Sequence, residues 1–130
     1  VLFTAHSLPA RIVESDDPYV EELTKAANLV ASRSDVTNWA LAWQSAGRTP
    51  EPWLGPDIRD VLRALAGEVA EIVVCPHGFT ADHLEVLYDI DIEAAAVAAE
   101  AGITLLRTPS FNDDAALVGA LADMVEAAAR

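Results

Sequence analysis

The sequence has 130 residues and a mass of 13.8 kDa, which is the size of a single domain. Apolar side chains make up 52% of it and charged ones 22%, a balance typical of a folded chain and not of a disordered one. Its formal charge of −13, from 21 acidic and 8 basic residues, argues against nucleic acid or an anionic membrane surface as a partner. No apolar run approaches the ~18 residues of a membrane span. These bounds predict an acidic cytoplasmic domain.

Short apolar or β-branched runs alternate with longer amphipathic segments along the chain. The predicted strands are Val1–Ala5, Asn38–Trp43, Ala70–Cys75 and Ile103–Arg107. This alternation is typical of βα units around a parallel sheet. Four such units make either half of a larger doubly wound enzyme or one flavodoxin-sized domain. Because the chain opens directly on an apolar strand with no Met, we interpret it as a piece of a longer protein.

Four segments between or after these strands predict helices, and Gly47–Pro56 predicts a loop. The helices start at Asp16-Asp17-Pro18, Pro56-Asp57, about Ala81, and Asn112-Asp113, and end near Ser32, Gly67, Ala101 and Ala128. In the last helix, the apolar residues expected to face the core are Leu117, Leu121, Met124 and Val125.

The residues directly after the strands are the first candidates for a site, because ligands of open parallel sheets bind outside the carboxyl ends of the strands. They are His6-Ser7, Gln44-Ser45, His77-Gly78 and Thr108–Asn112. The His6 imidazole ends the first strand and can reach such a crevice. The alternative is a strand-end histidine that is hydrogen bonded to a loop, and the position alone does not decide between them.

Charge is unevenly distributed along the chain. Residues 64–106 contain 8 acidic residues and no Lys or Arg. Glu85, Asp89 and Glu93 are spaced by four, so on a helix they form one row with about 6 Å between neighbours along the axis. A solvated acidic face is the common explanation of such a row. Carboxylates in a row also suit a divalent cation that moves between oxygen ligands, and together with His6 they suit Fe(II).

The remaining reactive side chains favour structural roles. His77 is expected to be a turn residue, His83 a loop or cap group, and Cys75 a buried small hydrophobe. A lone cysteine makes no internal disulfide. The sequence lacks a Gly-x-Ser-x-Gly elbow, a Walker loop and a Gly-x-Gly-x-x-Gly fingerprint, which disfavours a serine nucleophile and nucleotide binding.

Six motifs, which follow one another along nearly the whole chain, resemble those of ferrochelatases. The first four are Phe3-Thr4-Ala5-His6-Ser7-Leu8-Pro9, Asp17-Pro18-Tyr19, Trp43-Gln44-Ser45 and Pro52-Trp53-Leu54-Gly55-Pro56. The fifth, Pro76 to Asp91, contains Asp82-His83-Leu84-Glu85, and the last is Arg107 to Asp113. Two positions depart from the usual motifs, because Thr4 stands where Ser is frequent and His77 where an apolar residue is commoner.

The resemblance implies a Rossmann-like, chelatase-type α/β domain with a four-stranded parallel sheet flanked by helices. It implies that 1–130 is a single domain, the carboxyl-terminal half of an enzyme of two similar halves, whose amino-terminal half is absent. The porphyrin would lie in the cleft between the halves. The enzyme would be a lyase-type metal chelatase that inserts Fe(II), its substrate metal, into the porphyrin as two pyrrole protons leave.

The resemblance also implies roles for particular residues. His6 corresponds to the family's active-site histidine, a proton acceptor or metal ligand, and Glu85 to the carboxylate on the facing side of the cleft. The row from Glu85 through Asp89 to Glu93 corresponds to an acidic line on a helix with a π-type stretch, which handles metal and protons. Trp53 and Phe79 are candidate cleft walls that contact the porphyrin.

The identity of the porphyrin is inferred from composition and from the residues within the motifs. The Ala-rich composition and the motif wording favour an actinobacterial enzyme that acts on coproporphyrin III, and protoporphyrin IX is the alternative. Some ferrochelatases hold a [2Fe–2S] cluster with several cysteines, which Cys75 alone does not support. Two further alternatives are a small sirohydrochlorin cobalt chelatase, which is expected to carry a second histidine in place of Glu85, and a non-enzymatic acidic α/β metal-binding module.

Overall fold

The computed structural model describes residues 1–130 and contains one four-stranded sheet whose strands all run parallel. The strands are β1 (Leu2–His6), β2 (Ala40–Gln44), β3 (Glu71–Cys75) and β4 (Thr104–Arg107). Their order across the sheet is β2-β1-β3-β4, so β1 and β3 lie in the middle. The predicted parallel α/β architecture is confirmed, and the ends of the predicted strands lie within two residues of those observed.

The register of the sheet brings two predicted site positions together. β1 pairs with β2 from Leu2 opposite Ala40 to His6 opposite Gln44. On its other side, β1 pairs with β3 at Leu2 and Phe3. Because parallel strands share one carboxyl edge, His6 and Gln44 end side by side at the edge where ligands of such sheets bind.

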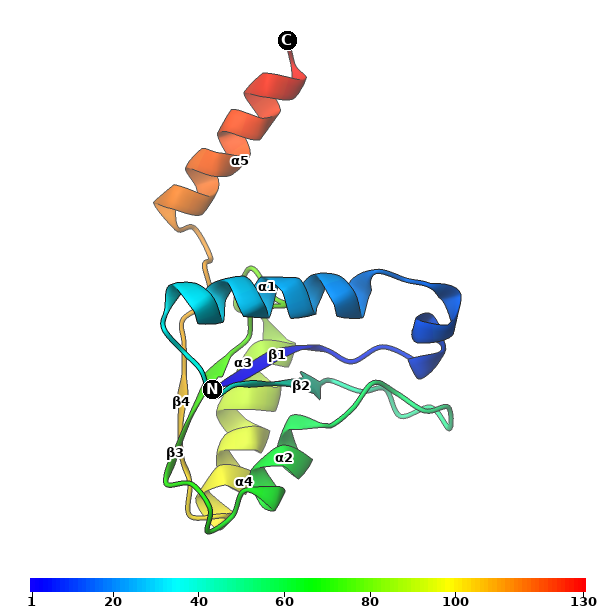
Figure 1. The fold of residues 1–130 in the computed structure, drawn as a ribbon, viewed down its shortest axis with the longest axis vertical. Coiled ribbons are helices and arrows are strands. Elements are labelled where there is room, and N and C mark those ends of the chain that lie inside the picture. The colour runs from blue at the N-terminus through cyan, green and yellow to red at the C-terminus, as the bar shows by residue number, and fades with distance from the viewer.

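Helices cover both faces of the sheet, with α1 on one side and α2 and α4 on the other (Figure 1). The α-helices are α1 (Tyr19–Arg33), α2 (Ile58–Ala64), α3 (Leu84–Tyr88), α4 (Ala95–Glu100) and α5 (Ala115–Ala128), and η1 (Ala10–Ser15) is a 3₁₀ turn. On one face, Phe3 of β1 packs in a small cluster with Ala27 and Ala31 of α1. The larger core joins the other face of the sheet to α2 and to the chain from Val86 to Ala98.

The predicted helix from Ala81 to Ala101 is interrupted. It starts only at Leu84, where the His83 side chain accepts a hydrogen bond from the Glu85 backbone N–H and caps α3. Between α3 and α4 the chain forms a π-helical segment, η2 (Asp89–Ala94). This agrees with the π-type stretch that the resemblance implies, and such segments are frequent at functional sites.

Ile90, in the π-helical segment, is fully buried in the larger core. Replacing it with alanine is expected to lower the free energy of unfolding by about 3 kcal/mol, through lost apolar contacts and a residual cavity. Ile92 lies in the same segment but is 58% exposed, so Ile92→Ala is the matched control with an expected change under about 1 kcal/mol. Denaturant unfolding of both variants measures the difference. Equal losses in the two would contradict this assignment of the core.

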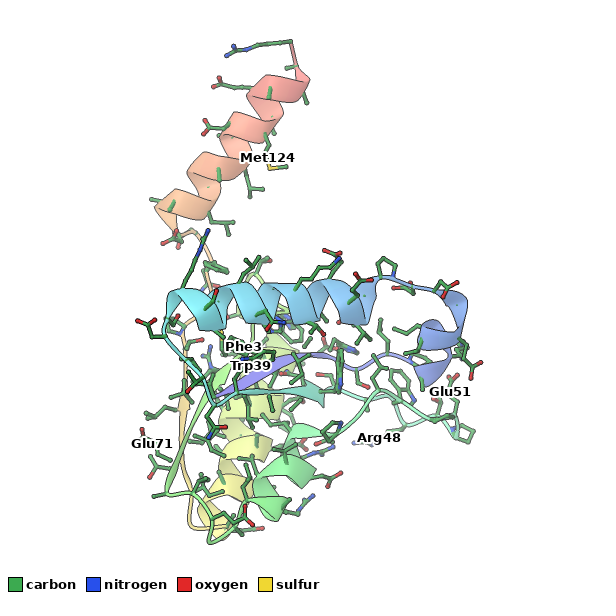
Figure 2. The ribbon with its side chains drawn as sticks, in the orientation of Figure 1. Phe3, Trp39, Arg48, Glu51, Glu71 and Met124 are labelled. Carbon is green, nitrogen blue, oxygen red and sulfur yellow. The ribbon has the colours of Figure 1, made fainter.

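The last predicted helix is present as α5, but the prediction that its apolar residues face the core is wrong. α5 projects away from the sheet (Figure 1), and none of its residues is buried. Of the four residues expected to face the core, Leu117 is half-buried, and Leu121, Met124 and Val125 are exposed. Figure 2 shows Met124 on the projecting helix. The apolar spacing specified a face but not its partner, and α1, α2 and α4 already cover the sheet. None of the helices is both long and apolar enough to span a membrane.

Candidate active site

His6 stands at the carboxyl end of the central strand β1, with its side chain 30% exposed. Its Nε2 atom lies 3.6 Å from Oε1 of Glu85, so the two residues that the sequence singled out are in contact. The Tyr19 hydroxyl donates a hydrogen bond to the His6 carbonyl oxygen at 2.9 Å, which fixes the backbone at this point. Burial raises the pKa of Tyr19, so this donor keeps its proton.

The hydrogen bonding of His6 defines which ring nitrogen is free. Nδ1 pairs with the backbone carbonyl oxygen of Ser7, and a carbonyl oxygen only accepts. In the neutral ring the hydrogen therefore resides on Nδ1. Nε2 is left with a lone pair beside Glu85, in position to take a proton or to bind a metal ion.

Glu85 lies in the first turn of α3, and its side chain is 51% exposed. His83, which caps this helix as the sequence predicted, also brings Nδ1 to 4.0 Å from the Glu85 carboxylate. The Glu85 backbone carbonyl accepts a hydrogen bond from Gln44 Nε2 at 3.4 Å. Glu85 is thus held by the end of β2 and faced by two imidazoles.

Asp89, one step along the row, is contacted from the end of β2. The Ser45 hydroxyl donates a hydrogen bond to Oδ2 of Asp89. Ser45 has a φ of 60°, an unusual left-handed backbone for a residue other than glycine, and unusual backbones of this kind cluster at functional sites. The sequence placed Ser45 among the strand-end candidates but gave no indication that it contacts Asp89.

Glu93, the outermost carboxylate of the row, is paired with Arg59 of α2. Nη1 of Arg59 lies 3.2 Å from Oε2 of Glu93. Asp57 anchors the same guanidinium, because its Oδ1 accepts from Nε at 2.9 Å and its Oδ2 from Nη2 at 2.8 Å. Burial acts to raise the pKa of Asp57, but the hydrogen bonds and charge of Arg59 outweigh it and hold this pKa below its usual value.

Asp89 and Glu93 line one cavity of about 400 Å³. Its other polar lining includes Gln44, Ser45, Arg48, Asp57, Arg59 and Tyr88. Gln44 is 1% exposed, and its Oε1 has no hydrogen-bond partner. An unpaired buried carbonyl in the wall of a polar cavity is an oxygen donor that a ligand or a hydrated cation would satisfy.

The four predicted metal ligands form a string and not a cage. His6 and Glu85 are in contact, whereas Asp89 and Glu93 line the cavity, which neither His6 nor Glu85 lines. No three His, Cys, Asp or Glu side chains come close enough to make a compact metal-binding group. Such a string suits a cation that is passed from one oxygen ligand to the next better than a cation that is stored.

Asp91, another carboxylate of the π-helical segment, is paired with Arg107. Arg107, at the end of β4, donates hydrogen bonds to both oxygens of Asp91, at 2.7 and 3.1 Å. It also reaches Asp82 at 3.1 Å, and Ser110 and Asn112 donate to the same carboxylate. These bonds join the last sequence motif to the start of the acidic helix and hold that helix in place.

Neither of the two predicted porphyrin contacts, Trp53 and Phe79, lines the polar cavity. Trp53 is half-buried in the loop after β2, where its Nε1–H donates to Thr49 and its ring lies where a Cβ on Gly47 would stand. Phe79 is half-buried against the larger core, with its ring 5.1 Å from that of His83. Both remain predictions as porphyrin walls.

Cys75 and His77 make contacts within the fold. Cys75 is half-buried and packs beside the Phe3 cluster, so the expectation that it is buried is only partly correct. His77 follows β3, and its Nε2 pairs with the Leu23 carbonyl of α1 at 3.0 Å.

The model of the ferrochelatase family matches residues 1–129. A ferrochelatase of Thermus thermophilus is 52% identical to the chain over 128 residues, and a coproporphyrin III ferrochelatase of Halalkalibacterium halodurans is 45% identical over 128 residues. These alignments cover 98% and 97% of this chain, but 40% and 41% of the relatives. The chain thus spans about two fifths of their length.

A solved structure shares the fold. It is that of a protein from Marinobacter aquaeolei VT8 described under cobalamin (vitamin B12) biosynthesis, CbiX. The superposition has a TM-score of 0.64 at 21% identity and covers 96% of this chain and 92% of that one. At this identity the likeness concerns the fold alone.

Proposed function

The chain belongs to the ferrochelatase family, and we propose that it is the carboxyl-terminal half of an enzyme that inserts Fe(II) into a porphyrin. The observation that supports this best is the contact between His6 Nε2 and Glu85 Oε1 at the carboxyl edge of the sheet. The proposal that a second half completes the enzyme is supported by the relatives, which are more than twice as long.

The reaction requires proton acceptors rather than a redox partner. Two N–H bonds of the porphyrin break, four Fe–N contacts form, and Fe(II) keeps its oxidation state while two protons leave. We propose that His6 takes one proton on Nε2, the nitrogen left free by the Nδ1 hydrogen bond to Ser7. Glu85, half-exposed beside it, takes the other or passes it toward solvent.

The acidic row is proposed to deliver the metal. Fe(II) accepts both carboxylate and imidazole ligands, and carboxylates exchange it more readily than thiolates would. Glu93 and Asp89 would receive the hydrated cation at the cavity and Glu85 would pass it to the ring. Distortion of the porphyrin would expose the pyrrole lone pairs, with the strain supplied by binding energy along the rest of the ring.

We propose coproporphyrin III as the porphyrin, because several of the relatives are named coproporphyrin III ferrochelatases. A comparison of kcat/KM for coproporphyrin III and protoporphyrin IX in the full-length enzyme tests this choice. A higher value for protoporphyrin IX would reverse it. A cytoplasmic location and an actinobacterial source remain predictions from composition.

The acidic row is expected to matter in a graded way. In the full-length enzyme, Asp89→Asn should raise the KM for Fe(II) about tenfold and lower kcat less than threefold, because it weakens metal delivery and leaves the proton acceptors intact. Insertion followed by porphyrin absorbance at varied Fe(II) gives both constants. Glu100→Gln, on α4 beyond the row, is the matched control and should change neither.

The alternative is an ordinary solvated face. Under it, Asp89→Asn would leave the Fe(II) dependence unchanged and raise the melting temperature slightly, because a like charge is removed from the row. That result would contradict the proposed metal path. Measuring kinetics and melting on the same variant separates the two outcomes.

A further inference from the structure

Arg59 lies between two carboxylates, Asp57 and Glu93, at the outer end of the acidic row. Its side chain is 40% exposed at the rim of the cavity, where it joins Asp57 at the start of α2 to Glu93 of the π-helical segment. Two of its nitrogens are bound by Asp57 at 2.9 and 2.8 Å, and only Nη1 reaches Glu93, at 3.2 Å. The guanidinium is therefore fixed from the side of α2 and would stay in place when Glu93 moves.

The carboxylates of the π-helical segment differ in whether they have an arginine partner. Residues 64–106 contain no Lys or Arg, so every basic partner comes from another element. Arg107 pairs with Asp91 and Arg59 pairs with Glu93, whereas Asp89 has no Lys or Arg partner. Of the two carboxylates of this segment that line the cavity, Asp89 and Glu93, only Glu93 is bound by a fixed cation.

We propose that Arg59 is a positioning residue. It serves as a permanent counter-ion of Glu93 and so weakens cation binding at the outer end of the row. This rests on the proposed function, in which Glu93 and Asp89 receive the metal. A divalent cation that binds beside Arg59 must displace Nη1 from Oε2 of Glu93 and meets a fixed positive charge. The cation is then held less tightly at the rim than at the inner carboxylates and moves inward.

The walls of the cavity are consistent with this role. Asp89, the Ser45 hydroxyl and the unpartnered Gln44 Oε1 supply oxygen atoms to its lining. Three acidic and two basic side chains line the cavity: Asp57, Asp89, Glu93, Arg48 and Arg59. Removing Arg59 leaves three acids and one base, a wall that would retain a divalent cation.

The test is Arg59→Gln in the full-length enzyme. We expect the KM for Fe(II) to fall about tenfold, with no rise in kcat, because the rim binds metal more tightly and releases it more slowly. Direct titration with Co(II), monitored by calorimetry, should show the same gain in affinity. Arg59→Lys keeps the charge but loses the two-nitrogen anchor to Asp57, so the KM should fall less than it does in Arg59→Gln.

Arg63→Gln is the matched control. Arg63 lies one turn further along α2, outside the cavity lining and paired with Asp60, and its loss should leave both KM and Co(II) affinity unchanged. In a Glu93→Gln background, Arg59→Gln should have less than half of its single effect, because the two residues act through one contact.

Several results would overturn the inference. An unchanged or raised KM in Arg59→Gln would do so, and so would an equal fall in Arg63→Gln. If Arg59→Gln does not fold, Arg59→Met, which keeps the aliphatic stem, takes its place, and failure of both to fold would show a purely structural role. If the wild-type enzyme inserts no metal, the proposed function fails, and the Co(II) affinities alone then decide on Arg59.

Discussion

Replacing His6 with alanine in the full-length enzyme is expected to lower kcat for metal insertion at least about a hundredfold. The variant removes the one nitrogen that faces Glu85 with a free lone pair, Nε2 at 3.6 Å from Oε1. Under the proposed function most porphyrin contacts lie away from His6, so the porphyrin affinity should change less than about threefold. Absorbance-monitored insertion measures the first quantity and fluorescence quenching the second.

The partner carboxylate provides the control for this prediction. Glu85→Gln keeps the shape of the side chain and removes its charge. If the two residues act as a unit, the double variant His6→Ala with Glu85→Gln should be little slower than the worse single variant. Retention of more than about a tenth of wild-type kcat in His6→Ala, a loss below ~1.4 kcal/mol, would contradict a chemical role for this imidazole.

The 130-residue chain by itself is expected to fold but to insert metal at least about a thousandfold more slowly than the full-length enzyme. Its sheet and helices bury a core of their own. Its site, however, is open, with His6 30% and Glu85 51% exposed. A site this open neither encloses a porphyrin nor excludes water.

Circular dichroism and thermal melting establish whether the isolated chain folds, and the insertion assay at equal molar concentration gives its activity. Adding the amino-terminal half as a separate polypeptide is the matched control and should restore part of the turnover. Turnover by the isolated chain within about tenfold of the full-length enzyme would contradict the two-half proposal.

Much of the fold could be predicted from the sequence because the signals were local. Apolar runs marked the four strands, and the rule that ligands bind at the carboxyl ends of strands selected His6 and Ser45 before any contact was known. The spacing along the sequence could not predict the contact between His6 and Glu85, since the two residues are 79 positions apart. It followed only from the resemblance, and the structure places the two side chains together.

The features that the sequence did not predict depend on contacts between distant elements. Nothing near Arg59 indicates that it crosses to Glu93, because that contact depends on how α2 packs against the π-helical segment. The acidic stretch lacks basic residues of its own, and Arg59 and Arg107 supply them from outside. α5 shows the converse, since its apolar spacing predicted burial and no surface of this chain covers it.

The π-helical segment changes the direction in which side chains point around the helix axis. Both the buried stripe, Val86, Ile90, Ala94 and Ala98, and the acidic row advance by four residues. In a uniform α-helix each four-residue step rotates the side chain by about 40°, so three steps would turn Ala98 about 120° away from the core that Val86 faces. The wider turn of η2 rotates each successive residue by a smaller angle, which offsets the rotation that accumulates in the α-helical turns. One short irregularity thereby keeps Val86 and Ala98 in a single core while the carboxylates stay in one line along the outside.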